Sequence, residues 1–440
     1  MTRSRIVCSA AVVLLGLAGA SALAQTLTPV EQLGKQLFFD KISSPAASMS
    51  CATCHAPNAG WTGAIGGINL HGAVYRGADP KRFGNRKPPS SAYASFRPIF
   101  QFQLLGPDDG RFVGGVMWDG RATGERLGSP VADQALGPPL SPVEQNMPSA
   151  KAVCMHVARS KYAKLFVEVW GPGSLDCSDA GIAATYDRIG LSIGRYEASS
   201  EVNSFSSRFD DYWRACLAAG NSEEACGLAE GEKMVLDPGG ILTDQEFDGL
   251  IEFGEYCSGC HTSTLPAAPG LPPLFTDNTF DNIGVPKNPD NPFYRMDEVY
   301  LDDGSPINPD GADWIDYGLG DFLRTRPEFA TYASDNDGKH RVPTVRNVDA
   351  RPGKGWPKAF MHNGVFKSLE EVVHFYNSRD VASEGWAPPE VDRNVNRELF
   401  EGKPLGNFEL DAEAEAAIVA FLRTLTDRDV AKKPAGNAKK

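Results

Sequence analysis

The chain has 440 residues, of which 42% are apolar and 22% charged, so it is long enough for two or three packed domains and is not a disordered chain. Its 45 glycines and 32 prolines indicate many turns and long loops, which argues against a coiled coil or helical solenoid. A net charge of −13 repels a phosphate backbone, so a basic protein is a better expected partner than nucleic acid.

The first 24 residues have the pattern of a signal peptide. Arg3 and Arg5 precede an apolar run at 6–17, and small residues end at a cleavage site after Ala24. No later stretch approaches 18 apolar residues, so we expect no membrane span. The mature protein is therefore expected in the oxidising periplasm.

Two capping boxes predict that a helix begins at the corresponding place in each half of the chain. Thr28 opens a helix through about Phe39, and Thr243 opens another that leads into the second motif described below. Apolar periodicity predicts a closing helix in each half, at 182–205 and at 412–425.

The motif C-x-x-C-H follows the opening helix in both halves. Two thiols one helical turn apart can form thioether bonds to the vinyl groups of a haem, and the adjacent histidine then lies under the iron. Zinc or a redox disulfide is the alternative for such cysteine pairs. The sequence therefore predicts two covalently bound haem c groups, attached at Cys51, Cys54 and His55 and at Cys257, Cys260 and His261.

Four further cysteines form an even set in a chain expected to be exported: Cys154, Cys177, Cys216 and Cys226. Two structural disulfides are the expected result, most simply between Cys154 and Cys177 and between Cys216 and Cys226. Three pairings are open on the sequence alone.

Alternating strand patterns are scarce, so the expected fold class is all-α, with two cytochrome c-like haem domains and long ordered loops. We expect the N-terminal domain at 25–230 and the C-terminal domain at 240–430, because a turn-forming segment lies between them. Residues 431–440 form a basic tail, expected to be flexible.

Further motifs carry a family resemblance. They are Trp118-Asp119-Gly120-Arg121, Gln134-Ala135, the run at 342–347 and Met361-His362-Asn363-Gly364. With the two haem motifs about 200 residues apart, nearly the whole mature chain resembles the bacterial di-haem cytochrome c peroxidase and MauG superfamily. The resemblance implies that the N-terminal haem reacts with peroxide, that the C-terminal haem moves electrons, and that a calcium ion lies between them.

On this resemblance, Gln134, Pro138 and Glu144 match the peroxide side of the first haem. Cleavage of the O–O bond needs a proton moved between its oxygens, which a carboxylate such as Glu144 can do, while Gln134 orients peroxide and Pro138 fills space. A solvated loop glutamate is the alternative. Trp118 matches a tryptophan between the two haems that relays electrons, although a lone tryptophan is more often a core residue.

His71 lies 16 residues after His55. Some di-haem peroxidases carry a histidine in the equivalent loop that caps the resting iron, whereas MauG-type members lack it. A solvent-facing histidine is the alternative.

The residue expected to ligate the second iron separates the branches. Classical members carry methionine 14 residues after the motif histidine, whereas here His362 is followed at that distance by Tyr376, as in MauG-type members. A capping box at Ser368 starts a helix on which Tyr376 shares the apolar face. A core tyrosine is the alternative, and Met361 is a poor substitute because it adjoins the motif histidine.

The resemblance also implies calcium ligands. The family uses an asparagine side chain and two backbone carbonyls, which here fall on Asn85, Pro357 and Ala359, with Lys87 in an alternative register.

Three functions follow. The leading one is a MauG-like enzyme, in which hydrogen peroxide drives the haem pair to a high-valent state that oxidises tryptophan-type residues of a small exported partner protein. The second is a cytochrome c peroxidase that reduces peroxide to water with electrons from a small cytochrome c or cupredoxin. The third is a non-enzymatic electron carrier, against which Gln134 and Glu144 argue.

Overall fold

A computed structural model of the chain describes residues 26–106, 109–296, 298, 300–301, 304–428 and 430. The predicted signal peptide at 1–24 and the predicted tail at 431–440 lie outside these residues. Within the described part, no helix is both long and apolar enough to cross a membrane.

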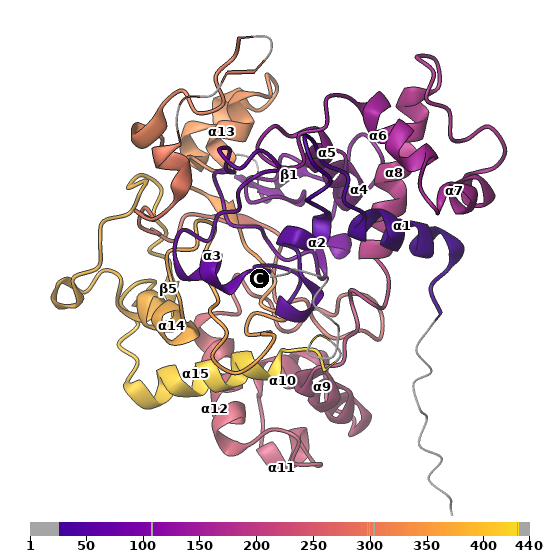
Figure 1. Cartoon of the computed structure of the whole chain (residues 1–440). Helices are drawn as coiled ribbons and strands as arrows, with labels where there is room; N and C mark the ends of the chain where they lie inside the picture. Colours follow the sequence, from indigo (N-terminus) through magenta and orange to yellow (C-terminus); the bar gives the residue numbers. More distant parts are fainter. Residues whose placement is uncertain are drawn as a thin grey trace, which may run out of the picture.

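Helices and loops dominate the architecture (Figure 1). The first half contains α1 (Pro29–Phe39), α2 (Cys51–Cys54), α3 (Gly66–Leu70), α4 (Pro130–Ala135), α5 (Gly137–Leu140), α6 (Ala150–Ala158), α7 (Ala163–Trp170) and α8 (Ile182–Glu197). The second contains α9 (Arg208–Ala218), α10 (Glu223–Leu228), α11 (Lys233–Leu236), α12 (Asp244–Tyr256), α13 (Leu319–Arg324), α14 (Leu369–Ser378) and α15 (Ala412–Thr424). Short 3₁₀ helices lie at Pro57–Ala59, Ala94–Phe96, Pro292–Arg295, Gly311–Asp313, Ala330–Tyr332, Ser334–Asn336 and Ala382–Glu384.

The described strands form three antiparallel two-stranded ribbons. They pair β1 (Gln101–Leu104) with β2 (Gly110–Val113), β3 (Phe280–Asp281) with β4 (His340–Arg341), and β5 (Leu399–Phe400) with β6 (Lys403–Pro404). In the first ribbon Phe102 lies opposite Phe112, and in the second Phe280 lies opposite Arg341. The fold is thus helix-rich with a few short strands, close to the all-α expectation.

Local sequence signals place the long helices. Thr28 and Thr243 accept backbone N–H groups of α1 and α12 and complete the predicted capping boxes. The closing helix α15 has nearly the predicted bounds. The closing helix α8 is shorter than predicted and ends at Glu197, whose carbonyl accepts a hydrogen bond from the side chain of Asn203.

Each half is built around one close helix crossing that has a glycine at the contact. A Cβ on Gly34 of α1 would lie 1.9 Å from the carbonyl oxygen of Ser192 in α8. A Cβ on Gly249 of α12 would lie 1.9 Å from the carbonyl oxygen of Ala417 in α15. Only glycine allows the two backbones to approach this closely, so the same packing device is repeated in both halves.

Two large apolar cores accompany these crossings. One includes Leu33 and Ile193, and the other includes Leu250 and Phe421. The buried side chains of α9 and α10 pack in the second core, whereas Leu274 packs in the first, so the two cores share segments of the chain. Figure 1 shows α1 and α6–α8 gathered at one side of the molecule and α12, α14 and α15 at the other.

A buried guanidinium joins the two cores. Arg346 is 1% exposed, donates to Asp210 at 2.5 Å and to the carbonyl oxygen of Pro273, and lies 4.6 and 4.7 Å from the ring centroids of Tyr93 and Phe205. The two rings belong to the first core, and Asp210 lies on α9. Charge pairing and cation–π contact therefore act across the junction.

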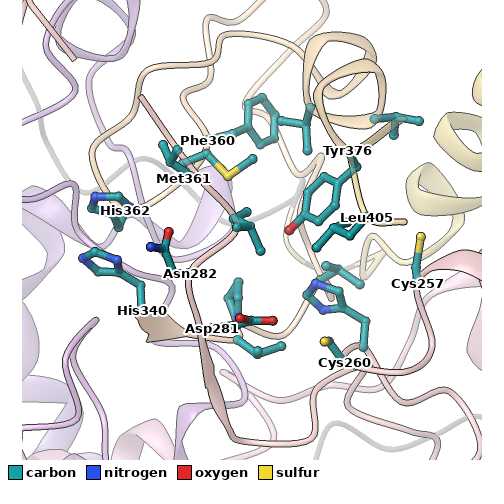
Figure 2. Close-up of a pocket in the computed structure, with 18 of the residues that line it drawn as sticks. Cys257, Cys260, Asp281, Asn282, His340, Phe360, Met361, His362, Tyr376 and Leu405 are labelled. Carbon is teal, nitrogen blue, oxygen red and sulfur yellow. The ribbon is translucent and has the colours of Figure 1, made fainter. Parts of the chain in front are cut away.

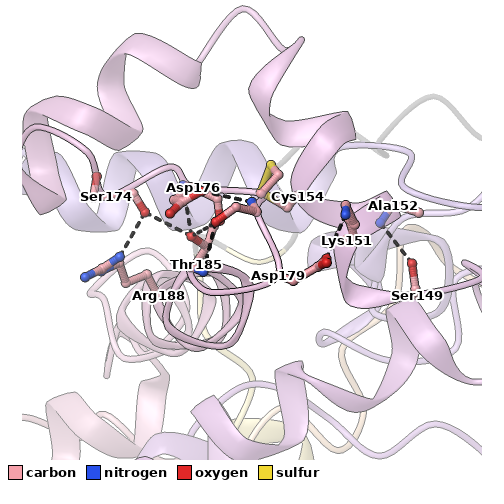
Figure 3. Close-up of a disulfide and its surroundings, with 12 residues drawn as sticks. Ser149, Lys151, Ala152, Cys154, Ser174, Asp176, Asp179, Thr185 and Arg188 are labelled. Carbon is pink, nitrogen blue, oxygen red and sulfur yellow. Dashed lines mark hydrogen bonds and ion pairs between the residues drawn. A yellow bond between two sulfur atoms is a disulfide. The ribbon is translucent and has the colours of Figure 1, made fainter.

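The two predicted disulfides are confirmed: Cys154 pairs with Cys177, and Cys216 pairs with Cys226. Figure 3 shows the first of them beside a set of hydrogen bonds in which the Thr185 hydroxyl donates to the carbonyl oxygens of Ser174 and Asp176. The disulfide thus ties α6 to the loop that leads into α8.

Replacing Gly249 by alanine should destabilise the protein by about 3 kcal/mol, the upper end of the ~1–3 kcal/mol range for overpacking, because the methyl group would collide with the α15 backbone. Chemical unfolding followed by circular dichroism measures this change. Gly67→Ala is the matched control, since a Cβ there meets nothing within 4 Å. Equal stability of the two variants would contradict the proposed close contact.

Candidate functional site

Both motif histidines are held in the same way by the backbone. His55 Nδ1 donates to the carbonyl oxygen of Trp61 at 3.2 Å, and His261 Nδ1 donates to that of Phe275 at 3.1 Å. Trp61 and Phe275 are fully buried and both have left-handed backbone, with φ of 60° and 57°. Because a carbonyl can only accept, each Nδ1 carries the proton and each Nε2 keeps its lone pair for a metal ion.

Burial lowers the pKa of both imidazoles, that of His55 to about 4. Both rings are therefore neutral at pH 7, which is the form that ligates iron. The neighbouring thiols of Cys51, Cys54, Cys257 and Cys260 are free, whereas the other four described cysteines form disulfides. A redox disulfide within either motif is thus not formed.

Each motif opens into its own cavity. The first cavity is lined by Cys54 and His55 together with Tyr75, Gln134, Glu144 and Glu197. The second is larger and mainly apolar, and it contains both cysteines and the histidine of the second motif. A free imidazole Nε2 and adjacent thiols fit a covalently attached haem in each cavity, with mainly apolar walls in the second and a mixed polar lining in the first.

Tyr376 reaches the second cavity from α14, which begins where the capping box predicted. Figure 2 shows its hydroxyl pointing into the cavity, which Cys257 and Cys260 also line. Burial and the two thiols raise the pKa of Tyr376. The sulfur of Met361 also points into this cavity, so the structure brings two candidate ligands to it.

Glu144 and Gln134 both line the first cavity, as the sequence predicted for a peroxide site. Burial raises the pKa of Glu144, although the charge of Arg121 and a hydrogen bond from Ser141 oppose this shift. Pro138 is not among the described residues that line the cavity; its carbonyl oxygen accepts the N–H of Gln145 and so holds the loop that carries Glu144.

Trp118 lines both cavities, and Arg341 is the other residue that they share in the described chain. The indole is buried, and its N–H donates to the carbonyl oxygen of Lys87 at 2.7 Å. The guanidinium of Arg341 lies 5.7 Å from the indole ring, and the ring of His362 lies 6.3 Å away. Trp118 is thus fixed between the two cavities.

A chain of buried charges runs beside Trp118. Arg121 and Arg86 both donate to Asp119, and Arg86 makes two further bonds, of 2.6 and 2.7 Å, to Asp316. Burial opposes ionisation of Asp119, but the two arginines outweigh it and lower its pKa to about 2. No local sequence pattern links Arg86 to Asp316, because they lie 230 residues apart.

Asp316 continues this chain to two histidines in the second cavity. Its carboxylate lies 3.2 Å from His340 Nε2, whose ring stacks on that of His362 with centroids 3.6 Å apart. Figure 2 shows both rings at the end of the cavity away from Cys257 and Cys260. The three residues have the donor types of a metal site. Both Asp316 oxygens already accept from Arg86, so the group fits a charge network better.

The remaining predicted residues lie elsewhere. His71 follows α3, is exposed, and is not among the described residues that line the first cavity. Asn85 lines that cavity, while the carbonyl oxygen of Pro357 accepts from Asn69 Nδ2 at 3.0 Å. In the described part of the chain, Asn85, Pro357 and Ala359 do not come together as an oxygen cage, so these residues do not fit the expected calcium ion.

Comparison with known proteins fits this geometry. Residues 29–216 match the model of the di-haem cytochrome c peroxidase family. The chain is 30% identical to the methylamine utilization protein MauG of Paracoccus denitrificans over 90% of this chain and 88% of that protein. The chain belongs to the di-haem cytochrome c peroxidase family. It is therefore a peroxide-dependent di-haem oxidoreductase, and the family implies two haem groups.

Further relatives cover a similar share of the chain. The cytochrome-c peroxidase IdrP2 of a Pseudomonas species is 24% identical over 90% of this chain and 80% of that protein. The crystal structure of the diheme peroxidase BthA of Burkholderia thailandensis has a TM-score of 0.67 and 26% identity, with coverage of 93% and 89%. A MauG-like protein associated with microbial copper homeostasis shares the fold, with a TM-score of 0.57 and 22% identity over 94% of each chain.

Glu197 is a carboxyl in the first cavity that the sequence reasoning missed. It is the last residue of α8 and is 4% exposed, and burial raises its pKa to about 8, while Ser91 opposes the shift. Its place on the buried face of an apolar-periodic helix was the available signal.

Replacing Glu197 by glutamine should raise the free energy of unfolding, relative to the wild type, by more at pH 8 than at pH 5. Between its ordinary pKa of 4.5 and about 8, the unfolded chain loses this proton while the folded protein keeps it, so wild-type stability falls as pH rises, by up to about 1.4 kcal/mol per pH unit. Urea unfolding at both pH values measures the difference. Glu255→Gln, at an exposed position, is the control, and a parallel pH response in both variants would contradict the assignment.

Proposed function

We propose that the protein is a MauG-like enzyme that uses hydrogen peroxide to oxidise tryptophan-type residues of a partner protein. The observation that carries the proposal is a tyrosine, Tyr376, that points into the second cavity where classical peroxidases of the family use methionine. The 30% identity to MauG along nearly the whole chain supports the same branch.

Two haem c groups would be attached through thioether bonds, at Cys51 and Cys54 and at Cys257 and Cys260. The free thiols and the tautomers of His55 and His261 support this attachment. When bound, the haem groups supply the redox chemistry with peroxide. The two cytochrome c-like domains expected from the sequence would each enclose one of them, which the repeated helix crossings support.

The chain's own groups would manage the protons of peroxide in the first cavity. Glu144 is suited to take a proton from the near oxygen and return it to the far oxygen, because its pKa is raised and it faces the cavity. Gln134 would orient the peroxide from α4, and Pro138 would position the Glu144 loop.

Trp118 would carry electrons between the two cavities, since its indole lines both and lies between them. Tyr376 would hold the second iron as a phenolate, an anionic and hard ligand that favours oxidised iron. Such a ligand would suit a haem that has to stay oxidised until a partner protein supplies electrons. His71 is exposed, which supports a resting first iron that is open to peroxide.

A cytochrome c peroxidase is the second candidate, in which a small cytochrome c or cupredoxin delivers electrons and peroxide is reduced to water. Met361 favours it, because its sulfur reaches the same cavity as Tyr376. IdrP2 and BthA, two relatives, are peroxidases by name.

We also propose that the protein acts in the periplasm on a small exported partner. The predicted signal peptide and the two disulfides support export to an oxidising compartment. The net charge of −13 favours a basic partner surface.

The diferric enzyme should react with stoichiometric peroxide without prior reduction. With the first iron open and Tyr376 bound to the second, EPR of the resting protein should show one high-spin and one low-spin haem. Addition of peroxide should produce a long-lived change in the Soret absorption band. An inert diferric enzyme that becomes active only after one-electron reduction would favour the peroxidase.

Glu144→Gln is the matched variant for this reaction. It should slow the peroxide step by about 10²–10⁴-fold and leave the low-spin EPR signal of the second haem unchanged. In the wild type the same step should slow as pH falls through the Glu144 pKa, which lies above 4.5, because the protonated carboxyl cannot accept the peroxide proton.

Tyr376→Met should change the second haem to histidine–methionine ligation and raise its reduction potential, because neutral sulfur replaces anionic oxygen. The variant should accept electrons readily from a c-type cytochrome, and its peroxide-oxidised state should decay faster. Potentiometry and absorption spectroscopy measure both effects. Methionine fills a similar volume, so the fold should survive.

Met361→Leu is the control. It should leave the potential and spectra of the second haem unchanged if Tyr376 is the ligand. If instead Met361→Leu changes the potential and spectra of the second haem and Tyr376→Met leaves them unchanged, the tyrosine assignment is wrong and the peroxidase is favoured.

A further inference from the structure

Three lysines lie where the two halves meet: Lys358 and Lys87 are buried, and Lys367 is half-buried. Lys358 is 6% exposed, and its ammonium group donates to the carbonyl oxygens of Ala59 at 3.1 Å, Asn347 at 3.4 Å and Ala350 at 2.7 Å. Ala59 belongs to the first half, and the other two acceptors belong to the second. One ammonium group therefore gathers carbonyl oxygens from both halves.

The surroundings of Gly60 show how closely the two segments of the chain approach each other here. A Cβ at this position would lie 2.8 Å from the carbonyl oxygen of Asn347 and 3.3 Å from Lys358 Nζ. The backbone also has a φ of +76°, which favours glycine. The first half is thus shaped around the lysine of the second half.

Lys87 has its ammonium group bonded within the first half and reaches the second half through its backbone. Its ammonium group is buried and donates to the Thr62 hydroxyl at 3.1 Å and to the carbonyl oxygen of Pro88 at 3.2 Å. Its backbone N–H donates to the carbonyl oxygen of His362, and its carbonyl oxygen accepts the indole N–H of Trp118. Lys87 therefore connects the second half to the tryptophan between the cavities.

Lys367 supplies a third contact across the junction. Its ammonium group donates to the carbonyl oxygens of Asn69 at 2.9 Å and His71 at 2.5 Å in the first half, and to that of Gly364 at 2.7 Å in the second. The carbonyl oxygen of Pro357, one of the expected calcium ligands, is bound by the Asn69 side chain instead.

These contacts compare poorly with a calcium site. Calcium takes six to eight oxygens, commonly including carboxylates. Here the hydrogen-bond acceptors of the three ammonium groups are backbone carbonyls and one hydroxyl, and the oxygens are already engaged. Burial lowers the pKa of Lys358 to about 7 and that of Lys87 to about 8, so at pH values below these a divalent ion added here would meet like charge in a medium of low dielectric constant.

We propose that the ammonium groups of Lys358, Lys87 and Lys367 take the place of a divalent cation at the junction, so that the enzyme holds its two cavities together without calcium. Each ammonium group donates two or three hydrogen bonds, and such charge-assisted bonds contribute more than bonds between neutral groups. The proposal does not depend on whether the partner of the enzyme is a protein substrate or an electron donor.

Metal analysis of the purified diferric holoenzyme tests the proposal. After gel filtration in chelator-treated buffer, we expect less than about 0.1 calcium per protein by mass spectrometry, against two irons from the two haems expected for the family. EGTA should leave the EPR spectrum and the rate of the peroxide reaction unchanged. About one calcium per protein, with altered spectra after its removal, would overturn the proposal.

Two variants test the role of the ammonium group itself. Lys358→Met keeps most of the length of the side chain and removes the ammonium donor of the Ala59 and Ala350 carbonyl oxygens, whereas the Asn347 carbonyl oxygen keeps the N–H of Ala350. Its melting temperature should therefore fall by at least about 3 °C, with full haem content. Lys164→Met, at a side chain that is 89% exposed, should be silent. Equal melting temperatures would overturn the proposal, and if Lys358→Met does not fold, Lys87→Met and the metal analysis decide.

Discussion

The buried guanidinium of Arg346 is the interaction on which the arrangement of the two halves depends. It needs Asp210 for charge pairing and the faces of Tyr93 and Phe205 for cation–π contact, and these partners come from both cores. A buried arginine without partners would destabilise the folded protein. The charge of Arg346 is therefore satisfied only when both cores supply its partners. The Tyr93 hydroxyl and Asn347 both donate to Asp427, which extends the same junction to the C-terminal segment.

The two halves repeat one device and differ where the chemistry differs. Each has a glycine at its main helix crossing, and each holds its motif histidine with the carbonyl of an aromatic residue in left-handed backbone. The opposite walls of the cavities differ, because Glu144 and Gln134 face the first and Tyr376 faces the second. A titrating carboxyl serves proton transfer, whereas a phenol can serve as a fixed ligand.

The local features of the structure could be predicted from the sequence. The C-x-x-C-H motifs, both capping boxes, the disulfide pairs and the start of α14 all depend on residues that are near one another in the chain. The long-range contacts that hold the two halves together could not be predicted from the sequence. Arg86 meets Asp316 across 230 residues, and Lys358 meets Ala59 across 299, which no local pattern encodes. The end of α8 was also misplaced, because the Asn203 side chain binds its last carbonyl.

The contacts around Trp118 explain why these long-range interactions matter. The indole is held by the Lys87 carbonyl, and Lys87 is itself tied to the His362 carbonyl across the junction. On its other side, the Arg86 chain fixes Asp119, the residue next to the indole. In the proposed function, electron transfer through Trp118 depends on a fixed separation of the cavities, so the ammonium groups and the ion pairs would act on it through this one side chain. The junction is therefore part of the proposed electron path as well as of the fold.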